Sequence, residues 1–199
     1  MVEDVEEERK REIDQALIDL MSDNESVICN AAVTLAINAK KGYLSKNALD
    51  FLVSLISHPS EKVRQSVMAA LVAYAERECA DREALVKLVG SFYAPKRKGS
   101  EEILDVDFKC SEISRAAGIR CIERYAAQDI YDPTALDLLI EILRQDKSPQ
   151  NRHLAAITLQ RYAEKNMLDE ENKKILRALA NEEIHDSVRV TIKKIVGLE

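Results

Sequence analysis

A short pattern of residues recurs along the chain at nearly constant intervals, and this periodicity constrains the fold more than any other feature. In the clearest copy, Val63 and Arg64 are followed by Val67, Leu71 and Tyr74. Copies of the pattern begin at residues 27, 63, 114, 151 and 188, at intervals of 36, 51, 37 and 37 residues. A unit of this length buries its apolar face only by stacking on neighbouring units. The sequence therefore predicts a repeat array with one insertion in its longest interval.

Each repeat has a second apolar stretch upstream of this pattern. These stretches show the i, i+3, i+4, i+7 spacing of an amphipathic helix, as in Leu136, Leu139, Ile140 and Leu143. Each repeat is therefore predicted to be a pair of helices. The predicted repeats cover approximately residues 12–41, 45–79, 81–128, 132–166 and 169–197, and the insertion covers 95–107.

Residues typical of helix ends stand where these pairs require them. Polar residues that cap helix N-termini precede several of the apolar stretches, and proline at the first helical position follows two of them. The predicted N-caps are Ser60, Asp132, Ser148 and Asp169, and Gly42 marks a helix end.

Composition also favours helices. The 199 residues include only 5 Gly and 4 Pro, and aromatic residues make up 5% with no Trp. These values argue against β-sandwiches and barrels, which need many turns and aromatic strands. Hydrophobic residues make up 46% of the chain, enough to exclude a wholly disordered polypeptide. We expect an all-α protein with a single domain over residues 1–199.

Two segments between predicted helices, residues 55–64 and 142–152, resemble the inter-helix turn of HEAT repeats. Both have a proline-containing turn, and an Arg near the start of the second helix. The resemblance extends over nearly the whole chain. It implies an α-solenoid, a right-handed superhelix of about five HEAT-like helix pairs, with the second helices on its concave face. Departures from the family pattern are Ile28 at the Arg position of the first repeat, and Ser114 and Asn151 at the aliphatic position.

One arginine recurs in each of the last four repeats, and two interpretations of this row remain open. In HEAT-like repeats such an arginine usually pairs with a turn acid of its own or an adjacent repeat, so the resemblance implies an internal ladder. Asp146 and Glu183 are the candidate acceptors. In the alternative interpretation the guanidinium groups contact a ligand. The arginines are Arg64, Arg115, Arg152 and Arg189.

A strip of small and apolar residues is predicted to project from the second helices, at positions equivalent to 65, 68 and 72. It includes Met68, Val72 and Ile119, and His153 lies at one of the equivalent positions. An exposed strip of this kind is suited to a partner helix or peptide. The alternative is that the strip is buried between repeats.

The insertion is the least repeat-like segment. It contains Lys96, Arg97 and Lys98, followed by four acidic residues. Long loops in compact arrays are often functional, and this one is a candidate contact for phosphate or an acidic partner. Three basic residues are too few to specify nucleic acid. The alternative is a solvated loop without a binding role.

The charge balance argues against a general affinity for nucleic acid or anionic membranes. The chain has 29 basic and 35 acidic residues, a net charge of −6. Much of the acidity lies within Glu3–Glu12, which is interpreted as an exposed helix or, alternatively, an acidic binding tail. No stretch approaches the length of a membrane span, and the charged start is unlike a signal peptide. We expect a cytoplasmic protein.

The sequence has no recognisable catalytic motif. The three histidines, His58, His153 and His185, fall in different repeats, and the four cysteines lack metal-ligand spacing. Cys29 and Cys121 are interpreted as core residues. We therefore expect no catalytic residue, no cofactor and no metal.

The leading hypothesis is a non-catalytic scaffold or adaptor that binds an unidentified protein or peptide on its concave face. One alternative is nucleic-acid or phospholigand binding through the arginine row and loop 96–98. Another is a HEAT-like enzyme or cofactor chaperone related to bilin lyases. The oligomeric state is not predicted. The candidate partner-binding residues are Arg64, Met68, Val72, Lys96, Arg97, Lys98, Arg115, Ile119, Arg152, His153 and Arg189.

Overall fold

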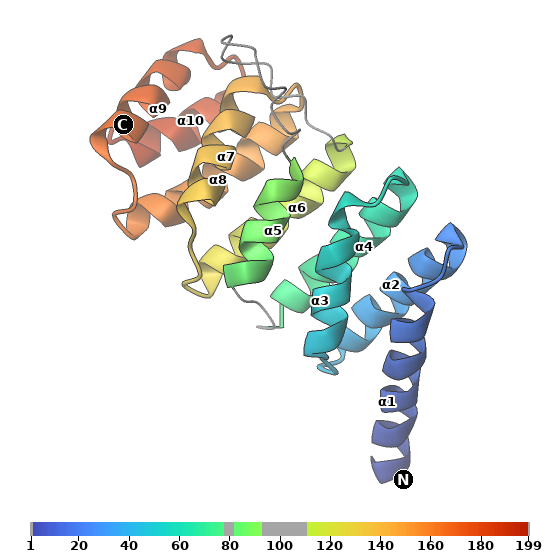
Figure 1. The fold of residues 1–199 in the computed structure, drawn as a ribbon. Helices are drawn as coiled ribbons and strands as arrows, with labels where there is room; N and C mark the ends of the chain where they lie inside the picture. Colours follow the sequence, from blue (N-terminus) through green and yellow to red (C-terminus); the bar gives the residue numbers. More distant parts are fainter. Residues whose placement is uncertain (1, 78–81, 93–110, 199) are drawn as a thin grey trace. The chain divides into compact units, whose positions relative to one another are not determined.

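The computed structural model of the chain describes residues 2–77, 82–92 and 111–198, and these residues form α-helices and one 3₁₀ turn but no strand. The all-α prediction is therefore confirmed, and each predicted repeat contributes two helices (Figure 1). The first helices of the pairs are α1 Val2–Asp19, α3 Lys46–Ser54, α5 Arg82–Phe92, α7 Pro133–Gln145 and α9 Glu170–Glu182. The second helices are α2 Glu25–Lys40, α4 Glu61–Ala75, α6 Glu112–Ala127, α8 Pro149–Glu164 and α10 Asp186–Ile195, and the 3₁₀ turn η1 is Leu55–Ser57.

The chain divides into two compact units, Met1–Ser91 and Phe92–Glu199. The boundary falls within the predicted third repeat, 81–128. The single-domain organisation over 1–199 stays a prediction, as do the repeat limits. The insertion at 95–107, with Lys96, Arg97 and Lys98, lies outside the described residues.

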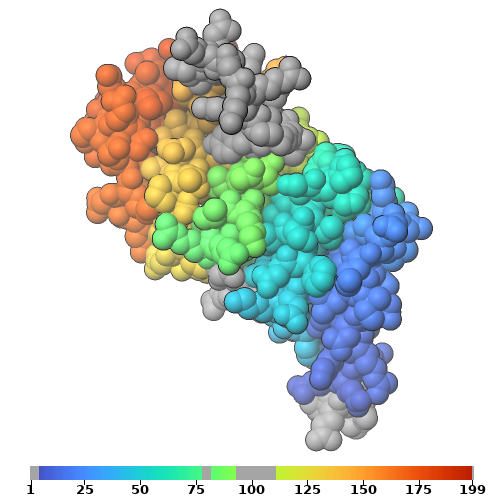
Figure 2. Space-filling model, viewed as in Figure 1, coloured from blue at the N-terminus to red at the C-terminus, as the bar shows by residue number. Residues whose placement is uncertain are grey.

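Unit 1 has two helical layers. The second helices α2 and α4 pack side by side, and α1 and α3 pack against them (Figure 1). Leu35 of α2, Leu52 of α3 and Val67 of α4 are fully buried between the layers. Burying each of these side chains contributes about 1.5–3 kcal/mol. The first turns of α1 extend beyond the other helices of this unit, and there Glu6, Glu7 and Glu8 are exposed (Figures 1 and 2).

Unit 2 repeats the same arrangement. Helix α8 packs against both α6 and α10 in the layer of second helices, while α7 packs on α8 and α9 packs on α10. Ile122 of α6, Leu139 of α7 and Leu159 of α8 are fully buried. The amphipathic spacing of Leu136, Leu139, Ile140 and Leu143 therefore predicts the buried side of α7 correctly.

The predicted helix N-caps all occupy the N-cap position with extended backbone, but only two of them act through their side chains. The side chains of Asp132 and Asp169 accept the N–H groups of Thr134 and Asn172 at 2.9 and 2.7 Å. Ser60 and Ser148 make no such bond. Instead, the Ser60 hydroxyl donates to Glu25 of the preceding repeat at 2.8 Å. The N-cap position of these two serines is therefore confirmed, but their side chains do not cap the helices.

The cysteines and tyrosines that the structure describes in the repeat pattern are core residues. Cys29 and Cys121 are buried free thiols, as interpreted from the sequence. Tyr74 and Tyr162 are fully buried and Tyr125 is 3% exposed. Burial raises the pKa of the Tyr162 hydroxyl to about 12. The Tyr162 hydroxyl is therefore shielded from solvent.

Candidate functional site

Two of the three recurrent arginines of unit 2, Arg115 and Arg152, are held by acidic residues of the next repeat. Arg115, at the start of α6, donates from Nε to Asp146 Oδ2 at 2.7 Å and from Nη2 to Asp146 Oδ1 at 3.1 Å. This bidentate geometry gives strong, well-oriented hydrogen bonds. The Asp146 side chain is fully buried, and that of Arg115 is 13% exposed.

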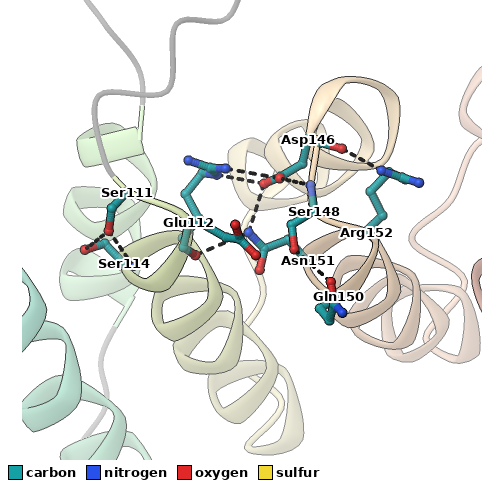
Figure 3. Close-up of polar contacts among 9 residues, drawn as sticks. Ser111, Glu112, Ser114, Asp146, Ser148, Gln150, Asn151 and Arg152 are labelled. Carbon is teal, nitrogen blue, oxygen red and sulfur yellow. Dashed lines mark hydrogen bonds and ion pairs between the residues drawn. The ribbon is translucent and has the colours of Figure 1, made fainter.

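Asp146 also organises its own turn, as Figure 3 shows. Its carboxylate accepts the Ser148 N–H at 2.9 Å and the Asn151 side-chain amide at 3.1 Å. Burial alone would raise the pKa of Asp146, but the hydrogen bonds from Arg115, Ser148 and Asn151 outweigh it and leave the pKa below its usual value. The carboxylate is therefore ionised at neutral pH.

Asn151 joins this turn to the preceding repeat, a role that its position in the sequence pattern did not suggest. Its amide also donates to the carbonyl oxygen of Glu112, at the start of α6, at 3.3 Å (Figure 3). Asn151 is 1% exposed, where the family pattern has an aliphatic residue. Ser114, at the equivalent position of α6, is also fully buried, and its hydroxyl accepts a hydrogen bond from the Ser111 hydroxyl at 3.3 Å. Both departures from the pattern are therefore satisfied polar residues.

The same pairing of a recurrent arginine with an acid of the next repeat occurs one repeat later. Arg152 donates from Nε and Nη2 to the Glu183 carboxylate at 2.8 and 3.0 Å, and Glu183 accepts the His185 N–H at 2.9 Å. The hydrogen bonds from Arg152 lower the pKa of Glu183. Arg152 also donates to the Asp146 carbonyl oxygen at 2.7 Å (Figure 3), and Arg189 to that of Glu183 at 3.2 Å. The internal-ladder interpretation is therefore confirmed for Arg115 and Arg152.

In unit 1, Arg64 binds its own turn. It donates to the carbonyl oxygens of His58 and Pro59 at 2.5 and 2.8 Å, and it pairs with Glu61 on the same helix. The Arg64 Nε is buried and has no hydrogen-bond partner in the described parts of the chain. The recurrent arginines are thus directed to the turns, which leaves them poorly placed as the main contacts for a ligand.

The predicted apolar strip is mostly buried. Met68 and Ile119 are 2% and 0% exposed, so the interpretation of these two side chains as partner contacts is wrong. The equivalent residues Ala32 and Ala156 are also fully buried. Each of these helices packs against another second helix, as α2 does on α4 and α6 on α8, so small and apolar side chains fill the space between neighbours. The alternative of burial between repeats was correct for this position.

The other predicted positions of the strip are partly accessible. Val72 and His153 are half-buried, and their binding role stays a prediction. Of the described histidines, cysteines and acidic residues, no three or more lie close enough to hold a metal ion.

The accessible face of the second helices lies about one residue further along each helix than predicted. On α6 it includes Ile113, which is 67% exposed, and on α8 it includes Ile157, which is 38% exposed. All of the positions on this face are exposed or half-buried. We call it the second-helix face of unit 2: Ile113, Ala117, Arg120 and Arg124 on α6, Gln150, Leu154, Ile157 and Arg161 on α8, and Ser187, Thr191 and Lys194 on α10.

Helices α6 and α8, which are neighbours on this face, run parallel and in register. The start of α8 contacts the start of α6 through Asn151 and Glu112, and the later parts of both helices are joined by an ion pair. In that ion pair Arg161 Nε and Nη2 lie 2.9 and 2.7 Å from Glu123 Oε1. Residues 37 apart therefore occupy equivalent positions on adjacent helices.

All four charged residues of the second-helix face are basic, although the whole chain carries a net charge of −6. Arg124 and Arg161 both lie near Glu123, at 3.5 and 2.7 Å. Arg120 and Lys194 are exposed and form no ion pair with the described part of the chain. The face therefore combines accessible aliphatic side chains with an excess of positive charge.

Comparison with known proteins agrees with this architecture. The sequence profile of the importin-beta N-terminal domain matches residues 126–196, which lie within unit 2. The crystal structure of one engineered protein superposes with a TM-score of 0.63 and 16% sequence identity, covering 92% of this chain and 77% of that protein. A second engineered protein gives a TM-score of 0.64 and 20% identity, covering 94% of this chain and 80% of that protein. The chain is an α-solenoid of HEAT-like repeats.

The HEAT-like fold generally serves as a scaffold for protein interactions. The similarity to the engineered proteins shows only that this chain has the same fold. No curated protein matches its sequence. Among the described helices, none is long and apolar enough to cross a membrane.

Proposed function

We propose that this HEAT-like solenoid is a non-catalytic scaffold that binds a protein or peptide through the second-helix face of unit 2. The observation that supports the proposal most directly is the exposure of Ile113 and Ile157 on parallel, adjacent helices. An accessible aliphatic surface beside polar and charged groups is typical of sites that bind an amphipathic partner. The resemblance to HEAT repeats supports it further, because it implies that the second helices line the concave face.

The buried ladder contributes by holding this face in place. Because Arg115 and Arg152 are satisfied by Asp146 and Glu183, they fix the register of adjacent repeats and do not compete for a ligand. This arrangement weighs against the alternative in which the arginine row binds nucleic acid or phosphate. A scaffold needs the relative position of its surface helices to be rigid, since preorganisation reduces the free-energy cost of binding.

Site-specific photo-crosslinking tests the proposal. The photoreactive amino acid p-benzoylphenylalanine replaces Ile157 on the second-helix face or, as a matched control, Ala178, an exposed residue of α9. After irradiation in cells that produce the protein, we expect a discrete protein adduct at position 157 and none at 178. Adducts of equal yield and pattern at both positions, or none at position 157, would contradict the proposed binding face.

A further inference from the structure

We infer that the partner segment is an acidic amphipathic helix, whose carboxylates contact Arg120 and Lys194 and whose apolar side chains contact Ile157 between them. This inference rests on the proposed function and adds the chemistry of the partner. Arg120, Ile157 and Lys194 are spaced 37 residues apart and occupy equivalent positions on α6, α8 and α10. They form one row across the second-helix face, with the aliphatic side chain in the middle.

The charges of the row select an acidic partner. Arg120 and Lys194 are exposed, and neither makes an ion pair within the residues that the structure describes. The residues that define the face include four basic side chains and no acidic one, and Glu123, which lies beside the face, is engaged by Arg161 at 2.7 Å. Like charges on an approaching segment would be repelled, whereas carboxylates would be attracted and would associate faster.

The aliphatic residues favour a protein helix over nucleic acid. Ile157 lies between the two cations, and Leu154 is half-buried one turn earlier on the same helix. A surface that follows a phosphate backbone gains affinity from consecutive basic and polar contacts, and an isoleucine at the centre of the row adds nothing to such contacts. An amphipathic helix, in contrast, covers the isoleucine with its apolar stripe and reaches the cations with the flanking residues.

The spacing of the row sets the length of the segment. Packed helices lie roughly 8–10 Å apart, so the two outer positions of a three-helix row are separated by about 16–20 Å. A helix rises 1.5 Å per residue, so carboxylates about 11 to 13 residues apart span this distance. Apolar residues about four and seven positions after the first carboxylate then lie over α8 on the same side of the ligand helix.

The test uses fluorescence anisotropy with the full chain and labelled synthetic peptides. The probe is a helical peptide of about 15 residues with glutamates about 11 positions apart and leucines between them. One control peptide carries lysine in place of each glutamate, and a second has the same composition in scrambled order. We expect the acidic helix to bind, the scrambled peptide to bind at least about tenfold more weakly, and the lysine peptide not to bind. The affinity for the acidic helix should fall as salt is added, because screening weakens exposed charge pairs.

Charge reversal locates the site. We expect Arg120→Glu combined with Lys194→Glu to reduce affinity for the acidic helix at least about tenfold, because two attractive contacts become repulsive. The matched control is Lys147→Glu with Lys174→Glu, which reverses two exposed lysines of unit 2 outside the row and should leave affinity within about twofold. Ile157→Ser should weaken binding while preserving its salt dependence.

Several outcomes would overturn the inference. If the crosslinker at position 157 captures a protein but the acidic helix does not bind, the proposed function stands and the acidic partner is wrong. Equal or tighter binding of the lysine peptide has the same meaning. Tight binding of single-stranded DNA that the charge reversal abolishes would assign the row to nucleic acid. Self-association of the chain that the charge reversal abolishes would assign the face to a second copy.

Discussion

Replacing Asp146 by alanine should be among the most destabilising single changes in unit 2. The carboxylate is fully buried and accepts hydrogen bonds from Arg115, Ser148 and Asn151. Its removal takes the bidentate acceptor away from a guanidinium group whose side chain is only 13% exposed, and it takes the same acceptor away from two polar donors. Breaking a buried charge pair in this way costs about 3–5 kcal/mol of unfolding free energy.

Urea unfolding followed by far-ultraviolet circular dichroism measures this loss, because the chain is helical and has no Trp. The matched control is Asp137→Ala, which removes an exposed carboxylate from α7, the helix that Asp146 follows, and should change stability by no more than about 0.5 kcal/mol. A double-mutant cycle with Arg115→Ala isolates the interaction. A loss below about 1 kcal/mol for Asp146→Ala, together with no coupling to Arg115, would refute the ladder as a stabilising element.

The pH dependence provides an independent check. Because the pKa of Asp146 is lower in the folded protein than its unfolded value near 3.9, the carboxylate stabilises the fold at pH values above about 4. This contribution is lost as the pH falls through the folded pKa. The stability difference between wild type and Asp146→Ala should therefore be constant between about pH 5 and 7 and should shrink below about pH 4. A difference that stays constant in acid would contradict the assignment.

Two further predictions concern glycine and tyrosine positions. A Cβ at Gly118 would lie 2.1 Å from Cζ of the fully buried Phe92, so Gly118→Ala should destabilise the fold by about 1–3 kcal/mol. A Cβ at Gly90 would meet no atom of the described residues within 4 Å outside its own helix backbone, so Gly90→Ala should stabilise the fold by up to about 1 kcal/mol. Urea midpoints test the opposite signs, and equal shifts would contradict the predicted clash. The pKa of Tyr162 is about 12 when folded and near 10 when unfolded, so the wild type should lose stability as the pH rises from about 10 to about 12. Tyr162→Phe should lose less over that range, and identical alkaline unfolding curves would contradict the burial of this hydroxyl.

The repeat period predicted both the helices and the ladder, because both depend on spacing along the chain. The 37-residue interval places every copy of the second helix at the same point in its repeat. Since Arg115 and Arg152 each precede their acceptor by 31 residues, the pairs with Asp146 and Glu183 follow from the same register. These ion pairs recur at the same positions of successive repeats, so the repeat pattern of the sequence is sufficient to predict them.

The accessible face was predicted less well, because hydrophobicity does not distinguish the sides of the second helices. On α8 the exposed side includes Ile157, while the buried side includes Asn151 and Thr158. Stacked repeats bury these helices on several sides, so apolar residues are not confined to one stripe. A better signal is the pair of charged residues Arg120 and Lys194, which lie on the solvent side at equivalent positions of their repeats.

The turn before α4 differs in sequence from the turn before α8 but keeps one of its hydrogen bonds. His58 precedes Arg64 by six residues, as Asp146 precedes Arg152. The His58 Nδ1 accepts the Ser60 N–H at 3.1 Å, as the Asp146 carboxylate accepts the N–H two residues after it at 2.9 Å. The imidazole therefore performs the turn-capping part of the acid's role.

In unit 2 the acid also holds the arginine of the preceding repeat. Position 58 has no such arginine to hold, because Ile28 occupies the arginine position of the first repeat. An acid at position 58 would then carry a charge without its usual partner, and an unpaired charge close to buried surface is costly. The His58 ring nitrogen accepts the hydrogen bond of the turn, and the side chain brings no carboxylate to this position. The two departures from the repeat pattern thus compensate each other: where the arginine is replaced by an aliphatic residue, the carboxylate is replaced by an imidazole acceptor.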